Sequence, residues 1–346
     1  MTLTNQSRQV QTKSGSYRTP LFLPVYQPND ACSIETLKNE FNIRGLILNS
    51  YFLYKNRPVK LEVLERGIKD YLSFDGMVMS DSGAFQQLRG PLYLSNKKIV
   101  AFQRDIGVDV ASPIDLISVP GDSKRVADKK LTTTLKRIQQ AMETSGESVL
   151  AGVQQGGRYL DLRERSIVAL VEMGVTYVAL GSLVPFFNRN HKIDFVGQVI
   201  HQARVNCPNE MPIHLYGSGD PLELPFFAAL GCDVFDSSSF VHYARQGWFM
   251  TAYGSFPDKE ALKRAEVPCD SPYYQSEGDA LWENEELLMR HNLWIIFSVM
   301  DQISACYEDG TLQDHLEHLV EVHQKHFPES QLEASWKIVR DQVRSV

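Results

Sequence analysis

Two aspartates, Asp81 and Asp236, stand where short apolar runs give way to small polar residues, in "GMVMSDSGAF" and "GCDVFDSSSF". Paired carboxylates suit chemistry at the anomeric carbon of a sugar, where one attacks to form a covalent ester and the other handles protons. Both residues also have an ordinary structural explanation, because Asp81 can cap the turn after it and Asp236 can cap the start of a helix. Spacing alone favours these capping roles over catalysis.

A second group of polar residues follows another apolar run, in "VQQGG" (153–157). Its two amides, Gln154 and Gln155, can hydrogen-bond the edge of a planar base, and glycines let a backbone approach closely, although glycine-rich strand ends are common. The stretch "LYGSGDP" (215–221) could cradle a phosphate, but it lacks the lysine and spacing of a P-loop and fits no dinucleotide fingerprint. The sequence therefore predicts no nucleotide cofactor.

The elements that must position these residues alternate between short apolar runs and amphipathic stretches. Helical stretches such as 131–145 and 161–174 carry apolar residues at three- and four-residue spacing. Each apolar run is short and ends in polar residues or glycine: 44–50, 76–82, 109–115, 148–155, 177–183, 211–217 and 232–238. This order predicts the α/β class and a closed (β/α)8 TIM barrel, with 247–254 as the candidate for its eighth strand.

In such a barrel the active site lies at the C-terminal ends of the strands. The unusual polar residues and glycines fall there: Asn49, Asp81, Asp115, Gln154, Gln155, Gly181, Gly217 and Asp236. We therefore expect Asp81 and Asp236 to meet at one mouth despite their distance in sequence. Two helical regions follow the barrel, with 280–310 as one long helix or a broken pair and 329–346 as a terminal amphipathic helix.

The chain has 346 residues, a formal net charge of −7 and five widely spread cysteines without a CxxC pair. These cysteines, and an N-terminal stretch without an apolar core, predict a cytoplasmic protein without disulfides or a membrane span. The acidity lies in 270–346, with 15 acidic and 5 basic residues against 27 and 30 in 1–269. Three basic clusters can contact phosphates or form a solvated face: 95–98, 122–130 and 189–192.

Seven motifs occur in an order that resembles the guanine transglycosylase family, over residues of about 15 to 300: "SDSGAFQ", "FQRDIGVDVASPIDLISVPGD", "GVQQGGRYLDLRERS", "ALGSLVP", "HLYGSGDP", "GCDVFDSSSFVHYA" and "RHNLW". Several of them are closer to the archaeosine-type, archaeal branch than to the bacterial queuosine branch. The family is a (β/α)8 barrel. The resemblance implies a pentosyltransferase that exchanges a guanine in a polynucleotide for a free 7-deazaguanine base without breaking the strand.

The resemblance also implies a role for each matching residue. Asp236 takes the position of the nucleophile that attacks C1′ of a flipped-out nucleoside, and Asp81 that of the general acid/base. The positions that bind the base are matched by Ser82, Phe85, Asp115, Gln155 and Gly181. Phe85 would stack on the ring, Asp115 would accept from N1 and the exocyclic amine, and Gln155 with the Gly181 backbone would meet O6. We expect the serines that follow Asp236 to orient it.

The sequence departs from the family in its zinc motif, which is usually Cys-x-Cys-x-x-Cys with a downstream histidine. Here Cys269 and His291 remain, while Ser271 and Tyr274 replace the other two ligands. Two ligands cannot hold a closed tetrahedral zinc site, so we predict a degenerate site without a structural metal. We expect His291 to be a hydrogen-bonded core residue, with Tyr273 and Tyr274 packing in the vacated space.

The resemblance divides the chain into a barrel body over 1–268 and, over 269–346, a zinc-region remnant with C-terminal helices packed on the barrel. The sequence holds no counterpart of the RNA-binding domains expected in full-length archaeal tRNA enzymes, which slightly favours DNA over tRNA as the substrate. A homodimer is also implied. Two other interpretations stay open: a non-catalytic partner subunit, which the lost zinc ligands suggest, and a carbohydrate-acting barrel that uses the same carboxylates.

Overall fold

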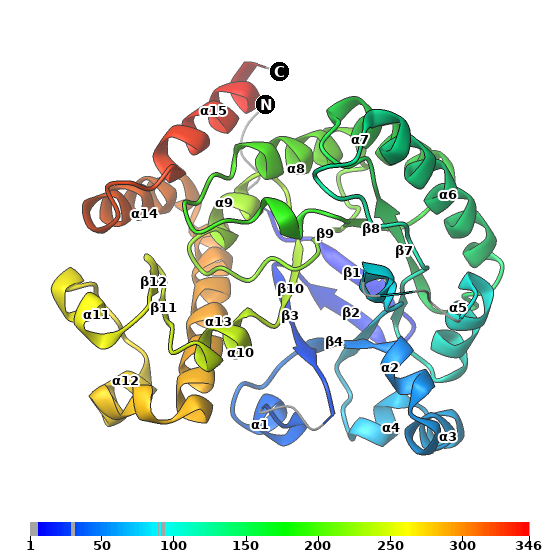
Figure 1. The fold of residues 1–346 in the computed structure, drawn as a ribbon, viewed down its shortest axis with the longest axis horizontal. Helices are drawn as coiled ribbons and strands as arrows, with labels where there is room; N and C mark the ends of the chain where they lie inside the picture. Colours follow the sequence, from blue (N-terminus) through cyan, green and yellow to red (C-terminus); the bar gives the residue numbers. More distant parts are fainter. Residues whose placement is uncertain (1–5, 29–31, 89, 91–93, 346) are drawn as a thin grey trace.

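A closed barrel of eight parallel strands forms the centre of the protein (Figure 1), in the order β10-β3-β4-β5-β6-β7-β8-β9. The computed structural model describes residues 6–28, 32–88, 90 and 94–345. The strands are β3 (Leu21–Tyr26), β4 (Gly45–Asn49), β5 (Met77–Asp81), β6 (Val110–Ala111), β7 (Val149–Gln154), β8 (Tyr177–Leu180), β9 (Ile213–Leu215) and β10 (Val234–Ser237). The predicted (β/α)8 barrel is therefore confirmed.

The placement of the eighth strand at 247–254 is wrong, because that strand is β3. The misplaced stretch forms β11 (Phe249–Thr251), which pairs antiparallel with β12 (Gly254–Phe256) outside the barrel. β3 is hard to find in the sequence because Pro24 lies inside it, and a proline without an N–H argues against a central strand. In the structure, Pro24 nevertheless pairs with Ser237 of the neighbouring parallel strand β10.

Helices surround the barrel and continue beyond it along one side (Figure 1). They are α1 (Ile34–Asn39), α2 (Ser50–Lys55), α3 (Arg57–Arg66), α4 (Ile68–Leu72), α5 (Asn96–Asp105), α6 (Lys124–Met142), α7 (Leu160–Glu172), α8 (Asp194–Asn206), α9 (Leu224–Ala229), α10 (Ser239–Arg245), α11 (Lys259–Ala265), α12 (Pro272–Glu277), α13 (Glu285–Asp309), α14 (Leu312–His326) and α15 (Leu332–Ser345). Within the described residues, none of the helices combines the length and the apolar character needed to cross a membrane.

Most of the predicted 280–310 helix is one continuous element, α13, with a short 3-10 helix before it. It begins where the Asn284 side chain accepts from the amides of Glu286 and Leu287, and it ends at Gly310, whose φ of +70° suits glycine. At the opposite end of the strands from the mouth, the hairpin of β1 (Gln9–Thr12) and β2 (Gly15–Arg18) packs Val10 and Tyr17 against the lumen.

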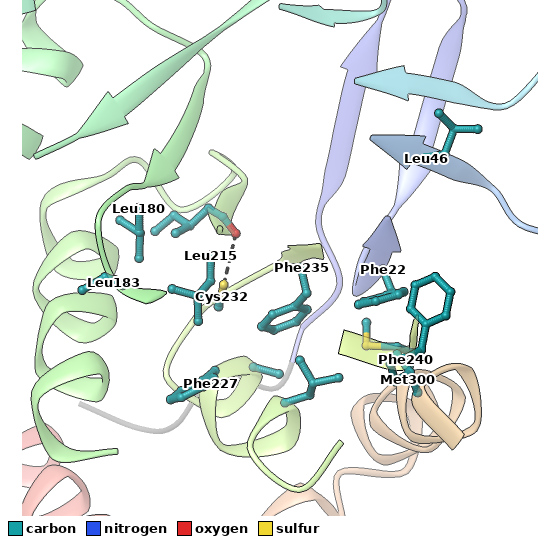
Figure 2. Close-up of a cluster of buried hydrophobic side chains, with 14 of the residues drawn as sticks. Phe22, Leu46, Leu180, Leu183, Leu215, Phe227, Cys232, Phe235, Phe240 and Met300 are labelled. Atoms are coloured by element: carbon teal, nitrogen blue, oxygen red, sulfur yellow. Dashed lines mark hydrogen bonds between the residues drawn. The ribbon is translucent and has the colours of Figure 1, made fainter. Parts of the chain in front are cut away.

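The alternation of side chains along each strand separates two apolar layers. One fills the lumen and includes Met77, Met79 and Val234, whereas the other lies between strands and helices. Figure 2 shows this outer layer beneath β10, where Phe235 points toward α9, α10 and α13. Because Phe235 points outward, the next residue, Asp236, must point into the barrel.

Candidate active site

A cavity of about 360 Å³ lies at the C-terminal ends of the strands. Its walls include five of the seven residues predicted for catalysis and base binding: Asp81, Phe85, Asp115, Gly181 and Asp236. The other two, Ser82 and Gln155, are buried beside them. A second cavity of about 420 Å³ shares Gln27, Leu48, Asn49 and Phe52 with the first but is not lined by any of these carboxylates.

Asp236 projects into this cavity from β10 and is held at one oxygen. Its Oδ1 accepts from the Gly217 amide at 3.1 Å and lies 2.9 Å from Nε2 of His214. The hydrogen bonds of the described residues leave Oδ2 without a partner. The side chain does not cap α10, whose N-cap residue is Ser238. The geometry therefore leaves one carboxylate oxygen available for attack.

The serines after Asp236 do not touch its carboxylate, so the expectation that they orient it is wrong. Ser237 Oγ accepts from the amide of Ser239 at 2.9 Å, and Ser239 Oγ donates to the Gly219 carbonyl at 2.8 Å. These short side chains satisfy backbone groups where the strand turns into α10. They position the loop, and His214 and Gly217 position the carboxylate.

Asp81 lies at the end of β5, in register with Asn49 of β4. Asn49 Oδ1 caps α2 by accepting from the amides of Tyr51 and Phe52, at 3.1 and 3.2 Å. The cap fixes the amide group, and its Nδ2 donates to Asp81 Oδ2 at 2.9 Å. Strand register and helix capping together therefore set the orientation of this carboxyl group.

Burial, and to a lesser extent the nearby carboxylates of Asp115 and Asp236, raise the pKa of Asp81 to about 7, although the amides of Gly83 and Ser82 oppose the shift. These amides show that Asp81 also stabilises the turn after it, so the structural explanation coexists with the chemical one. A carboxyl group with a pKa near 7 can both give and take a proton near neutral pH.

Asp115 lines the cavity and forms a buried polar pair with Gln155 behind it. Gln155 Nε2 donates to Asp115 Oδ2 at 2.6 Å. Within the described residues, Gln155 Oε1 and Ser82 Oγ are buried without a hydrogen-bond partner. Burial raises the pKa of Asp115 to about 6, although the Gln155 hydrogen bond opposes the shift. Because unpaired buried polar atoms are costly, this arrangement suits a ligand with donors and acceptors on one edge.

Gly181 lies beside this pair, but its backbone is already engaged. Its amide donates to the Gln154 carbonyl at 3.1 Å, and its carbonyl accepts from the buried guanidinium of Arg163 at 2.8 Å. A Cβ at this position would lie 2.7 Å from Nε2 of Gln155. Gly181 therefore contributes space for Gln155 rather than the hydrogen bond to O6 that we expected.

Gln154 and Gln155 point to opposite sides of the barrel wall, so only one of the two predicted amides lies on the side of the cavity, where it contacts Asp115. Gln154 Nε2 donates to the carbonyl of Arg163 on α7 at 3.1 Å, and its Oε1 accepts from that guanidinium at 3.3 Å. Strand alternation explains this difference.

Phe85 stands at the cavity with 48% of its surface exposed. A large apolar ring this exposed contributes little to the core, and its position suits stacking on a flat ligand. Tyr216 also lines the cavity, with its hydroxyl 3.0 Å from Ser112 Oγ. The sequence reasoning missed Tyr216 and His214, although period-two alternation through "HLYG" would have placed both on the lumen side of the strand.

The three basic clusters lie on the face of the barrel that carries the mouth. Lys98 and Lys124 stand near the starts of α5 and α6, and Arg189 lies between β8 and α8. In a (β/α)8 barrel, a helix begins on the side where the preceding strand ends. Arg189 also lies over the Trp248 ring, with its guanidinium carbon 4.0 Å from the centroid. This basic rim suits contacts to a phosphate backbone.

The region of the predicted zinc remnant is held by hydrogen bonds and aromatic packing. His291 is fully buried, accepts at Nδ1 from Ser271 Oγ at 2.7 Å and donates at Nε2 to the Met250 carbonyl at 2.9 Å. Burial lowers its pKa to about 4. With both ring nitrogens engaged and a serine at a ligand position, these residues do not fit zinc. No group of three possible metal ligands is arranged for an ion among the described residues.

Aromatic rings surround this histidine. Phe249 stacks on it at 3.8 Å between centroids and contacts Tyr274 edge-on at 5.2 Å, as expected for a tyrosine that fills the vacated space. Tyr273 behaves differently from our expectation, because its hydroxyl donates to Glu40 at the end of α1. One tyrosine therefore packs in this region and the other ties it to the barrel.

Comparisons with known proteins agree with the motif order. A profile of the family described as "Queuine tRNA-ribosyltransferase" matches residues 6–325. The chain is 32% identical over 322 residues to the tRNA-guanine(15) transglycosylase of Methanosarcina barkeri, which covers 91% of this chain and 65% of that protein. Proteins of the same name from Haloarcula marismortui and Methanocaldococcus jannaschii are 33% and 32% identical, over 86% and 89% of this chain. The chain spans 61% and 48% of those two relatives.

Proposed function

Because the chain belongs to the queuine tRNA-ribosyltransferase family, we propose that it is a guanine transglycosylase that exchanges a guanine in tRNA for a free 7-deazaguanine base. The observation that carries this proposal is one cavity that combines Asp81 and Asp236 with a buried Asp115–Gln155 pair. The first two groups supply the chemistry at C1′, and the pair supplies recognition of a guanine-like edge. The relatives named above are tRNA enzymes, which supports tRNA over the DNA substrate that the sequence slightly favoured.

In the proposed reaction, Asp236 Oδ2 attacks C1′ of the flipped-out nucleoside. The C1′–N9 bond breaks as the Oδ2–C1′ bond forms, and the departing guanine takes a proton from Asp81. In the second half, the incoming base attacks C1′ and gives a proton to Asp81, while Asp236 leaves as a carboxylate. Two successive displacements keep the configuration at C1′ and leave the phosphate backbone intact.

The proposed base recognition uses groups that already face the cavity. An ionised Asp115 accepts from N1–H and the exocyclic amine, and Gln155 turns its amide from Asp115 toward O6 of the base. Phe85 stacks on the ring. The basic rim around the mouth holds the polynucleotide, and the cytoplasm is the compartment that we propose. The homodimer that the resemblance implies stays a prediction.

Replacing Gly181 with alanine is expected to raise KM for free guanine about tenfold. The new Cβ would lie 2.7 Å from Gln155 Nε2 and 2.9 Å from Val153 Cγ1, so Gln155 would have to leave its place beside Asp115. Initial rates of exchange at varied guanine concentration measure the effect. Gly121→Ala is the matched control, because a Cβ there meets no atom within 4 Å. Equal KM values in the two variants would contradict the role of Gly181.

To test the function, purified protein is incubated with labelled guanine and one of three polynucleotides: bulk tRNA, single-stranded DNA or double-stranded DNA. Denaturing gels then show which polynucleotide has gained the label. We expect incorporation into tRNA only. Incorporation only into DNA would overturn the proposed substrate but keep the reaction. Failure to label any polynucleotide, together with failure to trap a covalent adduct, would overturn the proposed enzymatic activity. It would favour the interpretation as a non-catalytic partner subunit.

A further inference from the structure

A buried chain of polar groups leads from the middle of the barrel to Asp236. The Tyr177 hydroxyl lies 2.9 Å from Nδ1 of His214, and Nε2 of the same ring lies 2.9 Å from Asp236 Oδ1. Tyr177 and His214 are both fully buried. Neither residue takes part in the proposed reaction as described so far, and polar groups inside a barrel lumen are expensive unless they are paired.

The carboxylate determines which nitrogen of His214 carries the proton. A lone pair on Nε2 would face a carboxylate oxygen at 2.9 Å and repel it, so Nε2 must carry the hydrogen. Nδ1 then accepts from the hydroxyl of Tyr177. Burial raises the pKa of Tyr177 well above its usual value, which keeps that hydroxyl protonated and able to donate. The tyrosine therefore gives a hydrogen bond to the nitrogen that the carboxylate leaves without a proton.

We propose that His214, held by Tyr177, is a positioning residue that binds Oδ1 of Asp236 and thereby makes Oδ2 the attacking oxygen. This inference rests on the proposed function. The Gly217 amide donates to the same Oδ1 at 3.1 Å, so a bonded amide and a nearby imidazole nitrogen converge on one oxygen. The imidazole is close to Oδ1 but falls short of hydrogen-bond alignment in the free protein. Rotation of the carboxylate toward C1′ completes that alignment.

The same contact acts on the second half of the reaction. In the covalent intermediate Oδ1 is an ester carbonyl with little charge, and it becomes a carboxylate oxygen again as the incoming base displaces Oδ2 from C1′. Negative charge therefore develops on the carboxylate that His214 contacts, in a buried site where such stabilisation is strong. His214 makes Asp236 a better leaving group. Its loss should slow this second displacement more than the first, so the covalent intermediate should accumulate.

Kinetics of two variants test this role. In His214→Phe, turnover should fall about 100-fold with little change in KM for guanine, while the fraction of enzyme trapped as a covalent adduct with tRNA rises. Tyr177→Phe should show the same pattern with a smaller loss, and His214→Gln, which can supply an amide N–H, should restore part of the turnover. A fall of turnover and adduct together would overturn the proposal and leave His214 a packing residue.

Tyr307→Phe is the matched control for loss of a buried tyrosine hydroxyl, because that group donates to the Ala228 carbonyl at 3.2 Å outside the barrel lumen. We expect it to lower thermal stability without changing the adduct fraction. Should it shift that fraction as Tyr177→Phe does, the effect would be one of stability, and the proposal would fall.

Nitrogen NMR of histidine-labelled protein tests the geometry without any enzyme activity. His214, assigned through the His214→Gln variant, should show a protonated Nε2 and an unprotonated Nδ1, and Asp236→Asn should shift the Nε2 signal. A protonated Nδ1 with a bare Nε2 would overturn the proposal. Correct tautomers without any base exchange would instead point to failure of the proposed function.

Discussion

Replacing Asp236 with asparagine is expected to lower base exchange by about four orders of magnitude or more. An amide oxygen is a poor nucleophile, so the covalent ester with C1′ does not form and the reaction loses its two-step path. The measurement is incorporation of labelled guanine, combined with a denaturing gel for the protein–tRNA adduct. Both signals should disappear. An asparagine variant that kept even a few per cent of the activity would show that another group attacks C1′.

The asparagine variant should fold normally, because its side-chain oxygen can still accept from the Gly217 amide. Asp233→Asn is an informative contrast on the same stretch. That buried carboxylate bonds Arg8 at 3.0 Å and Arg204 at 3.5 Å, just before β10 begins. Its loss leaves buried charge unpaired, so we expect a lower melting temperature with turnover per folded molecule retained. The two variants separate an effect on chemistry from an effect on stability at two carboxylates only three residues apart.

The positions of Asp81 and Asp236 could be predicted from the sequence because two simple periodicities determine them. Period-two alternation puts each residue on the lumen side of its strand, and the parallel barrel brings the strand ends to one mouth. The same reasoning failed for β3, where Pro24 hides a strand whose neighbours tolerate a missing N–H. Strand identity depends there on tertiary pairing, which local propensity does not report.

The orientation of individual polar groups could not be predicted, because it depends on which partner is nearer in three dimensions. Gly181 illustrates this, since its amide and carbonyl are taken by Gln154 and by Arg163, which lies on a helix 18 residues earlier in the chain. His214 illustrates it too. Nothing in the sequence links His214 to Tyr177, which is 37 residues away, until both strands pair side by side in the barrel.

Replacing Asp81 with asparagine is expected to slow exchange about 100- to 1,000-fold, because the departing guanine then loses its proton donor. Formation of the covalent intermediate should be slowed most, because a guanine that gains no proton is a poor leaving group. Rapid-quench measurement of adduct formation isolates that step. A variant whose adduct formed at the normal rate would show that solvent or another residue protonates the leaving base.

The pH dependence of the wild-type protein gives an independent check on the same group. Since burial and neighbouring carboxylates raise the pKa of Asp81 to about 7, its protonated fraction falls steeply above neutral pH. Adduct formation at saturating tRNA should therefore be nearly constant at pH 6 and should decline about tenfold per pH unit once the pH is well above 7. Asp81→Asn should remove this decline, because the asparagine has no proton to lose.

In Asp81→Asn, stability should change in the opposite direction to activity. The pKa of Asp81 rises from its ordinary value of 3.8 to about 7 on folding, so the folded protein holds this proton while the unfolded chain loses it. Stability from this site is present below pH 3.8 and is lost progressively as the pH rises toward about 7. Asparagine carries no such penalty and still accepts the turn amides of Ser82 and Gly83. The melting temperature of Asp81→Asn relative to wild type should therefore rise between pH 4.5 and 7.5, which marks Asp81 as a group kept for chemistry at the expense of stability.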